Sequence, residues 1–439
     1  MEMEWYWAFA TLVGTVVVLM AIGVPVALTF IIANFIGAVV FVGKIAGLTQ
    51  VIDNSTALIT SFTLGPVPMF IMMGSLFFHT GLAHRVFDGL DVLFGRLPGR
   101  LCYLTVAGGA LFATLTGSSM ANTAMLGSLM VPEMQRRGYS RRMSMGPILG
   151  TGGLAMIIPP SSLGVLLASI ANIDVGRLLI AGFLPGFVLA ALYAGLIFCQ
   201  IRLNPEGAPA YDVPPSSLRQ KLVMVSTNIL PMGIVVFMVI GFILLGWATP
   251  TEAAAFGVLG VIVLALLFRA MTWASLRIAV EATVKVGGMV FFILMSSTVF
   301  SQLLAMSGAS AGLVQWATGF EVSHLVVLFA MFMVLLVLGM FMDGVSMMLI
   351  TVPIFFPLAA VLGFDLIWFG LFVLITLEMA GTTPPFGLLL YVMLGVAPRG
   401  TTLLQVAGAA FPFLVCDTIL ILILVAWPGL ALYLPGLMD

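Results

Sequence analysis

Long apolar segments, many of them about as long as a membrane span, alternate with short polar segments along the whole chain. The first two, Trp5–Ile22 and Pro25–Val42, are separated only by a short glycine- and proline-containing turn. A helix needs about 20 apolar residues to cross the hydrocarbon core of a bilayer. The pattern therefore predicts an all-α polytopic membrane protein, with an amphipathic surface helix over Leu82–Leu97.

A polar segment from Thr116 to Thr123 interrupts the apolar run that follows this surface helix. Arginines precede the first apolar arm and follow the second, and Lys and Arg gather on the cytoplasmic side of membranes. Non-helical backbone at membrane depth occurs only where protein or a cavity surrounds it. We therefore expect a re-entrant helical hairpin over residues 100–137 that enters from the cytoplasm. The alternative is one ordinary spanning helix with a small-residue packing face.

The next apolar segment, residues 142–173, contains Gly150, Gly152 and Gly153, followed by Pro159-Pro160. The second proline lacks an amide hydrogen and disfavours α geometry at the residue before it. These features predict that the glycines and prolines break the helix and that its second half starts near Pro160. The free amides of that start would face the middle of the membrane.

The second half of the chain repeats these features at a nearly constant offset. Pro159-Pro160 recurs as Pro384-Pro385, and at the same spacing the first polar tip falls on Asp343-Gly344. One unit is thus used twice. The predicted units are residues 1–222, with a hairpin over 100–137 and a broken helix over 142–173, and residues 223–439, with a hairpin over 323–361 and a broken helix over 365–397.

The distribution of charge predicts opposite orientations for the two repeats. When crossings are counted from the basic base of the first hairpin, only Lys44 and Arg177 among the 16 Lys and Arg residues fall outside the cytoplasm. The base of the second hairpin carries Glu321, His324 and Asp365 and no Lys or Arg, so this hairpin enters from the other side. The same count places both termini on the side opposite the cytoplasm, which the family resemblance described below identifies as the periplasm.

Inverted repeats with paired hairpins and broken helices are typical of secondary transporters that bind substrate and coupling ions near the midplane. Carbonyls at the breaks, with Ser, Thr and Asn oxygens, can coordinate Na⁺, and half-helix N-termini can face an anionic substrate. The candidates for a first Na⁺ site are Ser118, Ser119, Asn122, Thr123, Gly152 and Gly153. The candidates for a second Na⁺ site are Asp343, Gly344, Ser346, Thr382 and Thr383. The candidates for substrate contact are Pro159, Pro160, Ser161, Pro384 and Pro385.

Four acidic residues within or beside apolar segments need separate interpretations. Asp343 is a functional candidate because a carboxylate at membrane depth is costly, although an aspartate there can also cap the second arm of its hairpin. Glu252 fits a capping box at a helix start. Glu378 precedes the second helix break and either supports an ion site or relays a proton. Asp417 lies in the last span opposite no obvious base.

Composition excludes several other classes. The net charge of −1, without a basic stripe, argues against a nucleic-acid partner. The three His residues are dispersed, and Cys102, Cys199 and Cys416 lack metal-ligand spacing, so we expect neither an enzyme nor a cofactor beyond Na⁺ as coupling ion. An ion channel would also need polar backbone in the membrane, but two opposed hairpins favour alternating access.

Several motifs together resemble the large membrane subunit of a tripartite ATP-independent periplasmic (TRAP) transporter, within the ion transporter superfamily. The matching stretches are Gly117-Ser-Ser-Met-Ala-Asn-Thr123, Pro159-Pro-Ser161, Thr249-Pro-Thr-Glu-Ala-Ala-Ala-Phe-Gly257, Met342-Asp-Gly344 with Pro353 and Pro357, and Gly381-Thr-Thr-Pro-Pro-Phe-Gly387. The resemblance covers essentially the whole chain. The first tip has no carboxylate between Gly117 and Thr123, so its ion site would rely on carbonyls, hydroxyls and the Asn122 amide.

The resemblance implies an elevator-type transporter in a bacterial inner membrane that imports organic acids, such as dicarboxylates or sialic acid, with Na⁺. It also implies two partners, a small four-helix membrane subunit and a periplasmic binding protein that delivers substrate. The moving part would comprise Arg100–Asn172 and His324–Val396. A stand-alone Na⁺/dicarboxylate symporter is the alternative within transporters.

Overall fold

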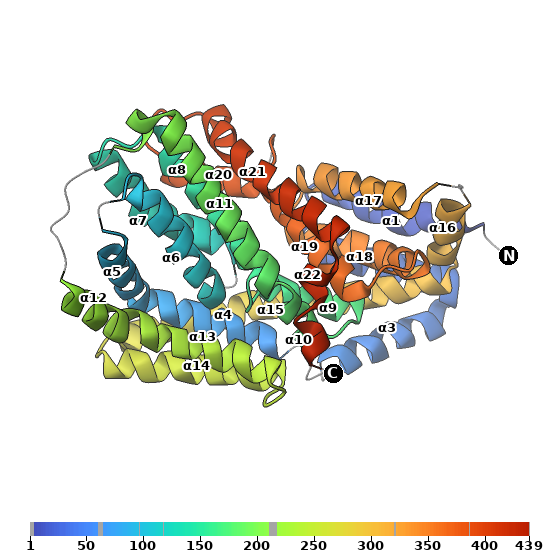
Figure 1. Cartoon of the computed structure of the whole chain (residues 1–439). Helices are drawn as coiled ribbons and strands as arrows, with labels where there is room; N and C mark the ends of the chain where they lie inside the picture. The colour runs from blue at the N-terminus through green and yellow to red at the C-terminus, as the bar shows by residue number, and fades with distance from the viewer. Residues whose placement is uncertain are drawn as a thin grey trace.

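The computed structural model describes residues 4–59, 65–95, 97–116, 118–209, 217–319, 322–385 and 387–438, and these residues form helices and short connections (Figure 1). The first helices are α1 (Trp5–Ala21), α2 (Val26–Gly37), α3 (Lys44–Ile59), α4 (Pro66–His79) and α5 (Leu82–Phe94). They are followed by α6 (Arg100–Thr116), α7 (Ser119–Arg136), α8 (Arg141–Ile157), α9 (Ser162–Ala171), α10 (Val175–Ala181) and α11 (Phe183–Leu203).

The second half contains the same kinds of element after a set of further helices. The connecting helices are α12 (Leu218–Met224), α13 (Leu230–Leu244), α14 (Pro250–Leu267), α15 (Trp273–Met306) and α16 (Ala309–Thr318). The last group is α17 (His324–Gly339), α18 (Gly344–Val361), α19 (Leu366–Thr382), α20 (Leu388–Val396), α21 (Leu403–Ala426) and α22 (Gly429–Leu432). In the view of Figure 1, the pair α6–α7 lies to the left and α17–α18 to the right, with α11 and α21 between them.

Six helical segments of the described chain are long and apolar enough to cross a membrane, or eight if each of two bent pairs is one span. One bent pair is α8 with α9, at 43°, where a broken helix is predicted. The other is α4 with α5, at 67°, so that α5, the predicted surface helix, turns away from the span before it. The buried face of α5 packs on α6. The chain is therefore an all-helical, multi-pass membrane protein.

The order of hairpin, broken helix and span occurs twice along the chain. Corresponding helices of the two copies begin and end at residues separated by one nearly constant offset. The helices α7 and α18 are separated in the sequence by the same offset as α8 and α19, and this is also the offset between the two proline pairs. Each hairpin consists of two helices in contact, α6 with α7 and α17 with α18. The Pro159–Pro160 and Pro384–Pro385 peptide bonds, one in each break, are both cis.

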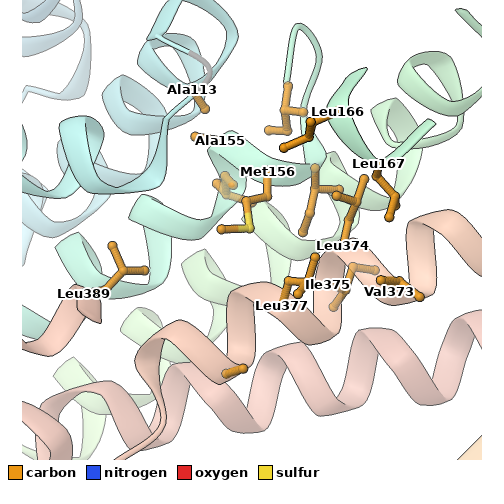
Figure 2. Packing of buried hydrophobic residues seen from close by; sticks show 14 of the residues in the cluster. Ala113, Ala155, Met156, Leu166, Leu167, Val373, Leu374, Ile375, Leu377 and Leu389 are labelled. Carbon is orange, nitrogen blue, oxygen red and sulfur yellow. The ribbon is translucent and has the colours of Figure 1, made fainter. Parts of the chain in front are cut away.

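The interior is built around α8 and α19, which are buried over most of their lengths and contact each other. Figure 2 shows Ala155 and Met156 of α8 near Leu166 of α9 and Leu374 of α19, all apolar and tightly grouped. Lipid tails are as apolar as these side chains, so close van der Waals packing is what holds such helices together. The two broken helices are thus the centre of the fold.

Two predictions of local structure are wrong in detail. The polar segment Thr116–Thr123 is largely helical, because the Ser118 hydroxyl accepts the amide of Ala121 and α7 begins at Ser119; Gly117 itself lies outside the described residues. The glycines from Gly150 to Gly153 lie inside α8 and do not break it.

The break in the first broken helix falls on residues 158–161, and its second half starts at Ser162, later than predicted. The Ser161 hydroxyl accepts the amide of Gly164 at 3.0 Å and so caps α9. A glycine in a helix interior costs roughly 1 kcal/mol relative to alanine, but here the glycines allow neighbouring helices to approach. At Gly146 and Gly150 of α8, an added Cβ would meet the ring of Phe413 of α21.

Candidate functional site

Both hairpin tips and both helix breaks border one cavity of about 550 Å³. The first tip contributes its residues 118–121 and the second its residues 342–345, while the breaks contribute Ser162 of α9 and Gly381 and Leu388 beside the second break. Mostly apolar residues of α4 and α15, with Ser75 and His79 of α4, line the remaining wall. Cavities of 300–1,000 Å³ with mostly apolar walls and a few polar groups are typical of small-molecule sites. The arrangement therefore offers one site shared by the two halves of the chain.

The first tip places its polar side chains against α8. The Asn122 amide nitrogen donates to the carbonyl oxygens of Gly109 at 3.4 Å and of Thr151 at 3.2 Å. The Asn122 Oδ1 and Thr123 Oγ1 atoms are buried and have no hydrogen-bond partner among the described residues. An oxygen left in this state loses the energy of its hydrogen bond to water, so it is suited to receive a ligand.

The two glycines of the predicted first ion site make the close approach of this tip possible. A Cβ at Gly152 would overlap Thr123 Oγ1, and a Cβ at Gly153 would overlap the carboxyl group of Glu378. Five of the six predicted residues of the first Na⁺ site thus come together, and the sixth, Ser118, caps α7 and lines the cavity. These five residues are Ser119, Asn122, Thr123, Gly152 and Gly153.

Glu378 joins the first tip, although it belongs to the second half of the chain. It is 2% exposed, and its Oε2 accepts a hydrogen bond from the Ser119 hydroxyl at 3.3 Å. The sequence located Glu378 only relative to the second helix break, which it precedes, and did not predict its contact with the first tip. The offset between the repeats makes Glu378 the equivalent of Gly153, with which it is in contact. In a pair of units related by two-fold symmetry, equivalent residues close to the axis lie close to each other. The nearly constant offset between the repeats could therefore have predicted this contact from the sequence.

The second tip is organised by Asp343. Its carboxylate accepts the backbone amides of Val345 at 3.0 Å and Ser346 at 3.2 Å, and also the Ser346 hydroxyl, so it caps α18. Thr382 and Thr383 donate their hydroxyls to carbonyl oxygens of their own helix, α19. Among the described residues no hydrogen bond joins these threonines to Asp343. Asp343 and Gly344 line the cavity, but the two threonines are not among its lining residues.

The predicted substrate contacts adjoin residues that line the cavity but are not among its lining residues. Pro159 and Pro160 are buried, Ser161 is used as a helix cap, and Pro384 and Pro385 are exposed. The cavity is bordered instead by Ser162 and other residues at the start of α9, by the starts of α7 and α18, and by His79 at the end of α4. Each helix start carries the positive end of a helix dipole. These dipoles contribute positive potential to a wall that no Lys or Arg of the described chain lines, while Asp343 adds a negative charge at the start of α18.

Asp417 has a partner that the sequence alone did not reveal. The Tyr193 hydroxyl of α11 donates to Asp417 Oδ1 of α21 at 2.5 Å, and both residues are buried. Nearly the same offset separates these two residues as separates the repeats, so they too occupy nearly equivalent positions of the repeated unit. Glu252 forms the predicted capping box with Thr249. Within the described residues, no group of three His, Cys, Asp or Glu side chains resembles a metal site.

Comparison with known proteins agrees with this architecture. A large permease protein of a C4-dicarboxylate TRAP transporter, DctM of Pseudomonas aeruginosa, is 32% identical over 85% of this chain and 86% of its own length. A DctMQ permease of an isethionate TRAP transporter from Oleidesulfovibrio alaskensis is 26% identical over 97% of this chain and 66% of its own. MtrF of Neisseria gonorrhoeae, described as an antimetabolite efflux pump, has a similar fold, with a TM-score of 0.63 at 14% identity over 90% of this chain and 94% of its own.

The family assignment rests on a match over nearly the whole chain. The family model described as "Tripartite ATP-independent periplasmic transporter, DctM component" matches residues 13–430. This range includes both hairpins and both broken helices. The chain therefore belongs to the DctM family, the large permease components of tripartite ATP-independent periplasmic transporters, and is not an enzyme.

Proposed function

We propose that this chain imports organic acid anions by a secondary, Na⁺-coupled mechanism. The observation that supports this function is the shared cavity, because both tips and both breaks border one space of small-molecule size. A site built from elements of both repeats can open to either side of the membrane when those elements move together. The moving part would comprise Arg100–Asn172 and His324–Val396, in an elevator-type motion against the other helices. The repeats, residues 1–222 and 223–439, would have inverted topology.

The proposed substrate is an anion because three helix starts, those of α7, α9 and α18, face the cavity. Their dipoles favour a carboxylate or a similar group, most clearly at α7 and α9, where neutral serine hydroxyls rather than a carboxylate cap the helix. The names of the two relatives give a C4-dicarboxylate and isethionate, both organic acids that are anionic at neutral pH. We assign the substrate contact to Ser162 and the adjacent start of α9. Dicarboxylates and sialic acid remain the substrates to test first.

The proposed Na⁺ sites lie at the two tips. At the first tip, the unpartnered oxygens of Asn122 and Thr123 are available to a cation. At the second, Asp343 has a carboxylate at the cavity wall, with Ser346, Thr382 and Thr383 close in sequence to the tip or the break. Ligands of this second site would have to exchange some of the hydrogen bonds they make within their own helices.

The proposed assembly has three components and lies in a bacterial inner membrane, with both termini of this chain on the periplasmic side. The family name specifies a tripartite, periplasmic system, and one relative is a DctMQ permease. We therefore propose a small four-helix membrane subunit and a periplasmic binding protein that delivers the substrate. A docking protein can control transport only through a difference in its affinity for the two conformations.

The test is uptake by the complete system. The chain is co-reconstituted with the small subunit into vesicles, and binding protein is added with radiolabelled succinate, sialic acid or isethionate. We expect uptake of at least one of these anions with an inward Na⁺ gradient, and none when choline replaces Na⁺ at the same ionic strength. Full uptake driven by a proton gradient alone would overturn Na⁺ coupling. Uptake without binding protein would favour a stand-alone symporter.

A further inference from the structure

Glu378 is a buried carboxyl group at the place where the two halves of the chain meet. It lies in the interior of α19, and its Oε2 accepts the Ser119 hydroxyl of the first tip at 3.3 Å. The carboxyl group occupies the space above Gly153 of α8, which any side chain there would fill. Three elements from both halves, α7, α8 and α19, thus surround this group.

The charge of this carboxyl group has no positive partner in the described part of the chain. The charge that acts on it is that of Asp417, which is also acidic and is hydrogen bonded to Tyr193. The other described titratable residues on helices that contact α19 form no hydrogen bond or ion pair with it. These are Arg141 and Arg142 of α8, Arg177 of α10, His324 of α17, Asp343 at the start of α18, Tyr391 of α20 and Cys416 of α21.

Two oxygens of the first tip, which Glu378 contacts through Ser119, also lack partners. Thr123 Oγ1 and Asn122 Oδ1 are fully buried without a hydrogen bond among the described residues. Ser119 and Thr123 are four residues apart and so lie on one face of α7. That face is turned to α8, because Gly152 adjoins both the Ser119 carbonyl oxygen and Thr123 Oγ1. Hydroxyl, amide and carboxylate oxygens are the ligands that hard cations prefer.

We propose that Glu378 supplies the negative charge of the first ion site, so that a Na⁺ ion is held between the first tip and α19. This inference rests on the proposed Na⁺ coupling and extends it to a residue of the opposite repeat. The first tip has no carboxylate of its own, and Glu378 provides one. Because the ligands come from α7 and from α19, bound Na⁺ holds the first hairpin against the second broken helix, and its release frees that contact.

The experiment measures Na⁺ affinity without needing a substrate. The full chain is purified in detergent, and its unfolding temperature is followed as NaCl replaces choline chloride at constant ionic strength. A ligand that binds only the folded state raises its stability in proportion to the logarithm of its concentration. We expect Glu378→Gln, which keeps the size and the Ser119 hydrogen bond, to weaken apparent Na⁺ affinity at least about tenfold. Glu252→Gln, which changes a carboxyl group outside the site and can keep its capping box, is expected to leave Na⁺ affinity unchanged.

A second variant, Thr123→Val, distinguishes a first tip that binds Na⁺ from one that does not. If Thr123 Oγ1 has no ligand, Thr123→Val removes an unsatisfied buried hydroxyl and should stabilise the protein in choline with unchanged Na⁺ affinity. If it binds Na⁺, the same change should also weaken Na⁺ affinity at least about tenfold. This variant keeps the shape of the side chain, so it tests the site even where Glu378→Gln folds poorly.

The outcomes separate this inference from the proposed function. Weaker Na⁺ affinity in Glu378→Gln and Thr123→Val, with normal affinity in Glu252→Gln, supports the site. Normal affinity in both variants, with clear Na⁺ stabilisation of the unaltered protein, overturns the role of Glu378 and leaves Na⁺ coupling in place. An unaltered protein that Na⁺ stabilises no more than choline does would overturn both.

Discussion

Asp343 combines a helix cap with a charge, and two substitutions separate these properties. Its carboxylate accepts two amides in the first turn of α18, from Val345 and Ser346. Asparagine caps about as well as aspartate, whereas alanine costs about 1 kcal/mol. Removing the negative charge from the helix start costs about 0.3–1 kcal/mol more. We therefore expect Asp343→Asn to lower stability by less than about 1 kcal/mol and Asp343→Ala by about 1–2 kcal/mol.

The effect on Na⁺ binding should be larger than the effect on stability. Two unit charges about 4 Å apart at an effective dielectric constant of about 20 interact by about 4 kcal/mol. If water and the neutral amide recover half of this, about 2 kcal/mol is lost, which corresponds to roughly 30-fold in affinity. Asp343→Asn is therefore expected to need about 30 times more Na⁺ for half-maximal stabilisation.

The assay follows the unfolding temperature of the two variants in detergent as NaCl replaces choline chloride. In choline, Asp343→Asn should unfold close to the unaltered protein and Asp343→Ala at a lower temperature. The NaCl concentration at which the unfolding temperature has risen by half of its total increase gives the apparent Na⁺ affinity. Unchanged Na⁺ affinity in Asp343→Asn, with the expected loss of stability in Asp343→Ala, would refute the ion-site interpretation and leave this residue as a cap.

Three further substitutions test the structure around the site. Tyr193→Phe removes the hydrogen bond to buried Asp417 and is expected to lower stability by about 1–3 kcal/mol, measured by thermal unfolding; the restoration of stability by Asp417→Asn in the same chain would support the pairing. Gly150→Ala would push against the Phe413 ring and should destabilise by about 1–3 kcal/mol, while adding Phe413→Leu should recover part of this. Glu252→Ala should weaken the start of α14 and leave Na⁺ affinity as it is, because the residue serves a capping box; a change in affinity would contradict that role.

The positions of the hairpins and broken helices could be predicted from the sequence because their signals are local and occur twice. Proline pairs, polar tips and apolar arms all recur in the second half at one nearly constant offset. The structure has the same offset between Ser118 and Asp343, which cap α7 and α18. A cap is a local feature of a few residues, so the chain order is enough to locate it.

The contacts between the halves could not be predicted from local pattern. The glycines of α8 were expected to break the helix because glycine has a low helix propensity. In the structure they stay helical, and their lack of a side chain leaves room for Phe413, Thr123 and Glu378 to pack against α8. Propensity is a weak guide where tertiary contacts decide. Glu378 was placed beside the second break in sequence, whereas the fold brings it to the first tip.

The contact between Gly153 and Glu378 also bears on how a duplicated protein can acquire two different sites. In a symmetric pair of identical units, residues on the two-fold axis face their own copies, so both positions must carry the same amino acid. Two glutamates there would place two carboxyl groups in one space, and two glycines would leave that space without a charge. When the two units differ in sequence, as they do within this chain, one copy can keep the small residue while the other carries the acid. Divergence of the two repeats thus permits a single charged group at this contact, and the shared space is the physical reason why Gly153 and Glu378 differ.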